Sequence, residues 1–186
     1  ISLASMASAS ANAVWITGIG AFSPLGADAD TSIEQALQGR SAIVRAPDDI
    51  CKWMPDCLAA LTPDPRTRLD KHAQTLARAT HLALVACSEA LAQSGLLDDP
   101  VRADRGRIGV FGGIGFGGAL SVDATYTRYH QALATGRNPS VMHPLSVPRI
   151  MANAPVASVS MKHGLRGSTY TYSVDCASSA VALGEA

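Results

Sequence analysis

The sequence predicts an α/β fold in which helices cover a layered sheet. Three observations support this prediction. β-type runs at residues 14–18, 107–111 and 170–174 alternate with stretches that favour helices. Glycine-rich turns follow the first two of these runs, as is typical where buried strands end. No similarity recurs with a period of roughly 20–50 residues, so a repeat architecture is not indicated.

The N-terminal part is expected to contain a tail, a strand and a short helix. Residues 1–13 lack the basic start of a signal peptide and begin with Ile, so we expect a disordered tail or a cloning remnant. Val14–Gly18 is β-type and leads into a glycine turn, which predicts a buried strand. Asp30 or Thr31 is placed to cap a helix that ends near Gln38.

A loop and a long helix are expected next. Residues 40–68 contain several prolines and mixed charges, which predicts a loop with short ordered pieces. Asp70 then offers an N-cap for a helix over residues 71–94, and Gly95 is a natural stop. Apolar residues lie on all sides of this helix, which indicates a helix buried inside a layered protein.

The rest of the chain predicts two further strands separated by helices. In order, we expect a strand over 107–111, a glycine-rich turn over 112–118, a helix over about 119–134, a loop over 138–149, a helix from Asn153 to about Met161, a turn over 164–167 and a strand over 170–174. A helix is expected after Cys176, because the residues that follow it are small and tolerate helical backbone.

Composition indicates a globular protein and argues against two classes of partner. The 186 residues are 47% hydrophobic, and 15 acidic and 15 basic residues are mixed along the chain. The formal net charge of zero predicts no basic face, so we expect no nucleic-acid partner. No apolar run approaches the roughly 20 residues that a membrane-spanning helix needs, so we expect no membrane partner.

Four cysteines are present, at positions 51, 57, 87 and 176. None belongs to a C-x-x-C pair, and the spacing of Cys51 and Cys57 fits no common pair of zinc ligands. We therefore expect reduced thiols in a cytoplasmic protein, without a metal. His81 and Cys87 lie in the interior of the long helix, where packing in the core or at an interface is the more frequent role.

The glycine run has three possible roles. Gly113, Gly115 and Gly118 satisfy G-x-G-x-x-G after a strand, which is the fingerprint of dinucleotide binding. That fingerprint belongs on the first strand of its domain and needs an acidic residue roughly 20 positions later, and residues 135–140 contain none. The alternatives are a tight turn under close packing and a turn that shapes a substrate pocket.

Cys176 stands between a β-type run and a run of small residues, which predicts a strand-to-helix turn. A thiol at the start of a helix lies near the positive end of the helix dipole, which favours the nucleophilic thiolate. A backbone N–H of the same turn can bind the oxyanion of an attacked thioester. Asp175 opposes this effect if its carboxylate faces the same pocket, and a lone cysteine is often only a small core residue.

Four segments in the same order resemble the β-ketoacyl–acyl carrier protein synthases, condensing enzymes of the thiolase superfamily. Residues 164–178, G-L-R-G-S-T-Y-T-Y-S-V-D-C-A-S, resemble the family's active-site stretch, in which G-L-R-G-P precedes a strand and T-A-C-x-S. Residues 14–26 resemble its opening V-x-I-T-G-x-G…S-P-x-G, and residues 107–118 resemble R-I-G-x-x-x-G-x-G-x-G-G. Residues 148–153 resemble the family's P…N segment. Val174 and Asp175 replace the usual Thr-Ala, and Ser168 replaces proline.

The resemblance implies a thiolase-like layered fold, with a mixed sheet covered by helices, usually in a homodimer. Residues 14–186 would form the N-terminal half of that fold and end in the nucleophile's helix. Cys176 would accept an acyl chain from an acyl carrier protein and pass it to a decarboxylated malonyl unit, without a cofactor, in fatty acid or polyketide-type synthesis. Phe116 would stand at the position that gates the acyl pocket.

The family's two catalytic histidines and its lysine lie in the second half of the fold. The five histidines present, at 72, 81, 130, 143 and 163, match none of those motifs, and the chain ends ten residues after Cys176. We therefore expect an N-terminal half that works with a C-terminal half, in the same or a separate chain, in a homodimer or heterodimer. The alternatives are a non-catalytic partner subunit of a ketosynthase heterodimer and, more remotely, a nucleotide-binding oxidoreductase.

Overall fold

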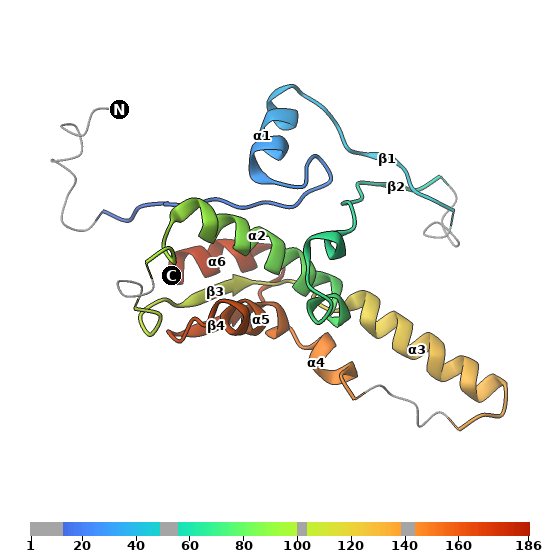
Figure 1. The fold of residues 1–186 in the computed structure, drawn as a ribbon. Coiled ribbons are helices and arrows are strands. Elements are labelled where there is room, and N and C mark those ends of the chain that lie inside the picture. Colours follow the sequence, from blue (N-terminus) through green and yellow to red (C-terminus); the bar gives the residue numbers. More distant parts are fainter. Residues whose placement is uncertain (1–12, 49–55, 100–103, 139–143) are drawn as a thin grey trace.

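A computed structural model describes residues 13–48, 56–99, 104–138 and 144–186. Two parallel strands, β3 (Val110–Gly113) and β4 (Thr169–Tyr172), pair in register from Val110 opposite Thr169 to Gly113 opposite Tyr172. Two helices pack on the pair, α5 (Ala154–His163) and α6 (Ser178–Glu185), and α2 (Arg78–Ser94) packs on α5 (Figure 1). The predicted α/β architecture is therefore confirmed.

Two adjacent glycines explain why helices cover both faces of β3. An ideal Cβ on Gly112 would lie 2.3 Å from Cγ2 of Val156 on α5. An ideal Cβ on Gly113 would lie 2.3 Å from the carbonyl carbon of Ser178 on α6. Since successive residues of a strand point to opposite faces, α5 and α6 lie on opposite sides of the strand. The expected strand over 107–111 thus begins three residues later and continues into the glycines expected to form a turn.

The start of α2 differs from the prediction. Asp70 does cap a turn, since its Oδ1 accepts a hydrogen bond from the Ala73 N–H at 2.8 Å, but that turn is a short 3₁₀ helix over Ala73–Thr75. Leu76 is extended, with ψ of 175°, so the backbone leaves the helical conformation before α2 begins. The helix ends as predicted, with Gly95 in the left-handed conformation.

One face of α2 forms the core of the described chain. Leu84 and Val85 pack with Leu69, Ala73 and Val159. His81 is also buried, and its Nε2 lies 3.0 Å from the Ala73 carbonyl oxygen. Burial lowers the pKa of His81 and raises the pKa of Cys87. The expected packing role of both residues fits this environment, although the opposite side of the helix is only partly covered.

The segment expected to form the first strand is not a strand. Among the described residues, 13–22 carry no strand assignment, and this segment runs along α2 (Figure 1). Its backbone N–H groups bond to side chains instead, with Ala21 donating to Glu89 Oε2 at 3.0 Å and Ile19 donating to Gln93 Oε1. Strand formation needs a neighbouring strand, and the described part of the chain supplies none for this segment.

Helix α1 (Ala29–Leu37) occupies the predicted region, but its cap is Asp28. Asp28 Oδ1 accepts a hydrogen bond from the Thr31 N–H at 2.8 Å, so Thr31 is the donor in this cap. Glu89 of α2 secures the same helix start, because its Oε1 accepts from the Ala29 N–H at 2.8 Å. One carboxylate therefore fixes both α1 and the segment before it against α2.

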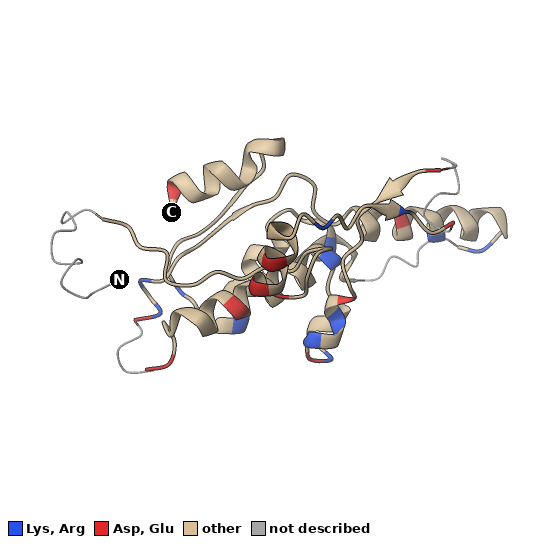
Figure 2. Cartoon of the chain, turned by 90° about the horizontal axis from the view of Figure 1, so that it is seen from above, with Lys and Arg blue, Asp and Glu red and all other residues tan. Residues whose placement is uncertain are grey.

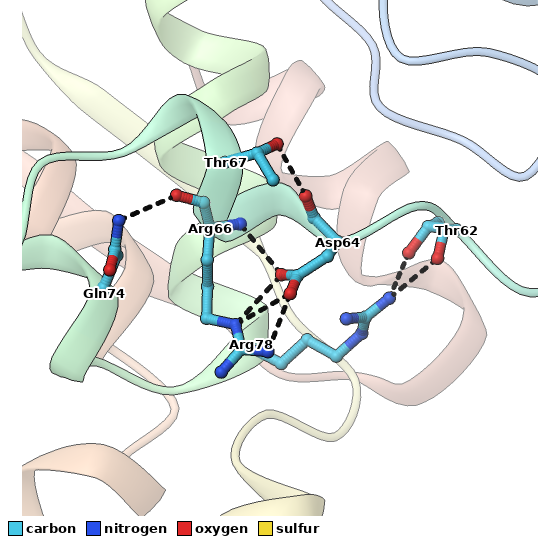
Figure 3. Close-up of polar contacts among 6 residues, drawn as sticks. All are labelled: Thr62, Asp64, Arg66, Thr67, Gln74 and Arg78. Carbon is cyan, nitrogen blue, oxygen red and sulfur yellow. Dashed lines mark hydrogen bonds and ion pairs between the residues drawn. The ribbon is translucent and has the colours of Figure 1, made fainter.

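The expected loop over 40–68 contains short ordered pieces, as predicted. Strands β1 (Val44–Arg45) and β2 (Leu58–Ala59) pair antiparallel, and a 3₁₀ helix follows at Pro65–Arg68. Figure 3 shows how polar side chains tie this loop to α2. Arg66 donates to Asp64 Oδ2 at 2.7 Å, which holds the pKa of Asp64 at about 2, and Arg78 donates to the Thr62 carbonyl oxygen at 3.3 Å.

The expectation of reduced thiols is wrong for one cysteine, because Cys57 is disulfide-bonded. Cys87 and Cys176 are free, which agrees with the expectation for these two residues. Cys51 lies outside the described residues, as do residues 1–12 of the expected tail.

Helix α3 (Ala119–Ala134) has the predicted bounds, and it extends away from the strand pair with no buried residue (Figure 1). Helix α4 (Ser146–Ile150) lies where a loop was expected over 138–149. Pro148 does not prevent it, because proline is tolerated in the first helical turn, where no intrahelical bond is lost. Residues 139–143 of that expected loop lie outside the described residues.

The described part of the chain exposes many large apolar side chains. Exposed apolar side chains include Val14 at 96% and Leu183 at 77%. Figure 2 shows acidic and basic residues interspersed over the described chain rather than gathered by sign. Within that part of the chain, no helix is long and apolar enough to cross a membrane.

Candidate active site

Cys176 lies where the chain passes from β4 into α6. β4 ends at Tyr172, a single 3₁₀ turn spans Asp175–Ala177, and α6 begins at Ser178. The cysteine is exposed and free. The predicted placement of this residue at a strand-to-helix turn is therefore confirmed. The first turn of α6 follows this short turn along the chain, so Cys176 stands at the N-terminal end of the helix.

Hydrogen bonds of Ser178 brace the turn that carries the cysteine. The Ser178 hydroxyl accepts from the Val174 N–H at 3.0 Å and donates to the Asp175 carbonyl oxygen at 2.7 Å. Asp175 has a φ of 51°, in the left-handed region that favours glycine. Sequence reasoning did not single out Ser178. The available signal was the serine two positions after the cysteine, in the C-A-S match.

The glycine run after β3 lies beside this turn. An ideal Cβ on Gly115 would lie 3.3 Å from the Asp175 carbonyl oxygen, and the Ile114 N–H donates to the Tyr172 carbonyl oxygen at 2.9 Å. The two segments that sequence reasoning singled out, about 60 residues apart, are thus neighbours. At Gly113 the expected close packing is present, since the backbone of α6 occupies the space that a side chain would need, but this glycine lies in a strand rather than in the expected tight turn.

Phe116 lies on the same run and lines a cavity formed with residues of α2 and α3. Its side chain is 84% exposed. It lines a cavity of about 170 Å³ together with residues of α2 and α3, among them Leu82 and Leu120. Cys176 does not line this cavity. The structure therefore brings the backbone of the two predicted segments together, while the Phe116 side chain lines a cavity to which Cys176 does not contribute.

The described residues contain no group of three or more His, Cys, Asp or Glu that could hold a metal ion. Among the described histidines, His81 and His163 have a pKa that their surroundings lower. Burial lowers the pKa of His163, with help from Lys162 and Arg105. Nε2 of His163, on α5, lies 3.2 Å from the Ser88 hydroxyl on α2. This histidine therefore serves the packing of α5 on α2.

Comparison with known proteins gives a consistent result. Residues 11–186 match a family model described as the N-terminal domain of β-ketoacyl synthases. The chain is 33% identical over 175 residues to nodulation protein E of Rhizobium sp. (strain N33), covering 93% of this chain and 42% of that relative. It is 29% identical over 188 residues to 3-oxoacyl-[acyl-carrier-protein] synthase 2 of Staphylococcus aureus (strain COL), covering 93% and 41%. The chain thus spans less than half of each relative.

Solved structures share the fold. A β-ketoacyl synthase from Burkholderia phymatum STM815 superimposes with a TM-score of 0.71 at 29% identity, covering 92% of this chain and 41% of that one. Ketosynthases in complexes with a chain length factor or an acyl carrier protein, at 18–21% identity, give TM-scores of 0.67–0.68 and show likeness of fold alone.

Proposed function

Because the chain belongs to the β-ketoacyl synthase family, as its N-terminal domain, we propose that it forms part of a 3-oxoacyl-[acyl-carrier-protein] synthase in fatty acid or polyketide-type synthesis. In this proposal Cys176 is the nucleophile. The observation that carries it is an exposed, free thiol directly before α6, on the turn that resembles the family's active-site stretch. The protein would be a cytoplasmic acyltransferase.

The reaction has two stages. The Cys176 thiolate attacks the carbonyl of an acyl-carrier thioester, and the carrier's thiolate leaves and takes up a proton. A malonyl-carrier thioester then loses carbon dioxide, and the resulting carbanion attacks the acyl-cysteine carbonyl. The cysteine leaves as thiolate, and the product is a 3-oxoacyl-carrier thioester. Division into two stages replaces one difficult carbon–carbon bond formation by two easier steps.

The rest of the catalytic machinery would come from a C-terminal half, in the same or a separate chain. Its docking would cover apolar side chains such as Val14, Ile16 and Leu183, which are 96%, 78% and 77% exposed. Exposed apolar surface of this extent is unusual for a monomer and is typical of an interaction surface. We propose that the complete synthase is a homodimer or heterodimer that receives its substrates on an acyl carrier protein. Phe116 would limit or admit the acyl chain once the second half encloses the pocket.

A second candidate function is that of a non-catalytic partner subunit in a ketosynthase heterodimer. Asp175 favours this alternative, because it places an exposed carboxylate next to the thiol, where the family usually has alanine. A negative charge at that position opposes formation of a thiolate if it faces the same pocket.

A labelling experiment separates the two candidates. The complete protein is incubated with a radiolabelled acyl-carrier thioester, and the adduct is mapped by peptide mass spectrometry. The synthase proposal predicts label on Cys176, loss of label in Cys176→Ser, and unchanged labelling in the matched control Cys87→Ser. Label absent from Cys176, with synthesis lost only when this chain is omitted from the assembly, would support the partner subunit instead.

A further inference from the structure

The residue before the candidate nucleophile is held in an unfavourable backbone conformation. Asp175 and Asp56 are the non-glycine residues with positive φ in the described part of the chain, and Asp175 has a φ of 51°. Such a conformation persists only where the surrounding structure enforces it. Asp175 is itself exposed, so its own side chain is not enclosed by a packed core. The constraint must therefore come from contacts of the backbone.

One buried hydroxyl supplies that constraint. Ser178 is 2% exposed, and its Oγ contacts the backbone at two points, accepting from the Val174 N–H at 3.0 Å and donating to the Asp175 carbonyl oxygen at 2.7 Å. The Asp175 carbonyl belongs to the planar peptide group that ends in the Cys176 nitrogen. Fixing that oxygen therefore fixes the plane from which the Cys176 side chain departs. At this burial, water does not compete strongly for either bond.

Ser178 is anchored in turn by the sheet. An ideal Cβ on Gly113 would lie 2.3 Å from both the carbonyl carbon and the carbonyl oxygen of Ser178, so β3 lies directly against the backbone of this residue. The serine also begins α6. A continuous set of contacts thus runs from β3 through Ser178 to the peptide group that carries Cys176.

We propose that Ser178 is a positioning residue for Cys176, whose hydroxyl maintains the left-handed conformation of Asp175 and the orientation of the peptide before the nucleophile. This inference rests on the proposed function, because it concerns how that cysteine meets an acyl thioester. The serine touches no substrate in this role and acts only through the turn.

The test compares Ser178→Ala with Ser179→Ala in the complete protein, since Ser179 is the next residue of the same helix and is exposed. Displacement of a reacting group by about 1 Å can reduce a rate by about 100-fold. We expect Ser178→Ala to lower kcat for acyl transfer about 10-fold to 100-fold with KM for the carrier unchanged. Ser179→Ala should retain the wild-type rate, and Ser178→Thr, which keeps the hydroxyl, should retain most of it.

A double variant separates positioning from general loss of structure. Glycine adopts the left-handed conformation without strain, so Asp175→Gly should restore part of the activity that Ser178→Ala removes. The rate of Cys176 alkylation by iodoacetamide is measured against pH in the same variants. Ser178→Ala should change the alkylation rate of the folded protein, because the peptide group before Cys176 changes its orientation, whereas a variant that is merely less stable keeps the rate of its folded fraction.

The possible results are distinct. Wild-type kcat in Ser178→Ala overturns the inference, and so does a loss that Asp175→Gly leaves unchanged and that matches the fraction of unfolded protein. If wild-type protein takes up no acyl label, the proposed function fails, and the alkylation profile still decides whether Ser178 orients the cysteine.

Discussion

Substitution of Gly113 by alanine tests whether close packing of β3 against α6 positions the candidate nucleophile. The added Cβ would lie 2.3 Å from the carbonyl carbon and oxygen of Ser178 and 2.4 Å from the Ser179 nitrogen. All three are backbone atoms, so no rotamer change relieves the overlap. Ordinary contact begins at 3.4 Å, and α6 must therefore move by about 1.1 Å (3.4 minus 2.3) from β3.

The expected loss of stability follows from this displacement. Overpacking of a well-packed site typically costs about 1–3 kcal/mol. For a protein of this size, each kcal/mol changes Tm by roughly 2–4 °C, so Gly113→Ala should lower Tm by roughly 2–12 °C. Because α6 moves with the turn that carries Cys176, the iodoacetamide alkylation rate of the folded protein should change as well. Differential scanning calorimetry and timed alkylation measure the two effects.

Two further glycines serve as controls. Gly184 lies in α6 with no atom within 4 Å of its ideal Cβ, so Gly184→Ala should be neutral or raise stability by at most about 1 kcal/mol. The Cβ of a Gly112→Ala variant would meet a single side-chain atom at 2.3 Å, Cγ2 of Val156, and Val156→Ala should relieve much of its loss. The reasoning is refuted if Gly113→Ala melts at or above the wild-type temperature with unchanged alkylation.

Three more predictions concern the core around α2. Leu84 is 1% exposed, so Leu84→Ala should cost about 2–5 kcal/mol in urea unfolding, whereas Leu183→Ala, at a site 77% exposed in this chain, should cost little unless a partner covers it. Glu89→Ala should cost about 1–3 kcal/mol by leaving two backbone N–H groups without their acceptor, and Glu89→Gln should recover part of that loss; equal stability of all three proteins would contradict it. Burial lowers the pKa of His81 and His163 in the folded state, so the unfolded chain binds more protons below about pH 6.5 and stability should fall as the pH decreases through that range. Urea unfolding at pH 7.5 and 5.5 measures this loss of stability. If a His81→Gln variant shows the same pH dependence as wild type, His81 is not its cause.

The sequence predicted correctly those helices and turns whose ends are set by residues close to them in the chain, such as a glycine at the end of a helix. Helix α3 has its predicted bounds, and Gly95 and Gly164 end α2 and α5 in the left-handed conformation. The position of Cys176 between β4 and a helix was predicted for the same reason, since a β-type run and a run of small residues are both local patterns. The family resemblance added the expected layered architecture, which the fold comparison bears out.

Predictions failed where the outcome depends on residues far apart in the chain. Val14–Gly18 has the composition of a strand, but its backbone donors meet the side chains of α2 rather than another strand. Gly112 and Gly113 were assigned to a turn, yet pairing with β4 draws them into the sheet. Asp70 has the right chemistry for a helix cap and caps a separate turn, because the backbone is extended at Leu76.

The sequence by itself determined the α/β class, the order of most elements and the identity of the cysteine at the strand-to-helix turn. The tertiary structure decided which residues hold that cysteine in place. The role of Ser178 became visible only from the hydrogen bonds between its buried hydroxyl and the backbone of Val174 and Asp175. The role of Gly113 became visible only from the packing of α6 against β3. Composition and periodicity report the preferences of a segment, whereas hydrogen bonds and close contacts between segments form only after the chain has folded.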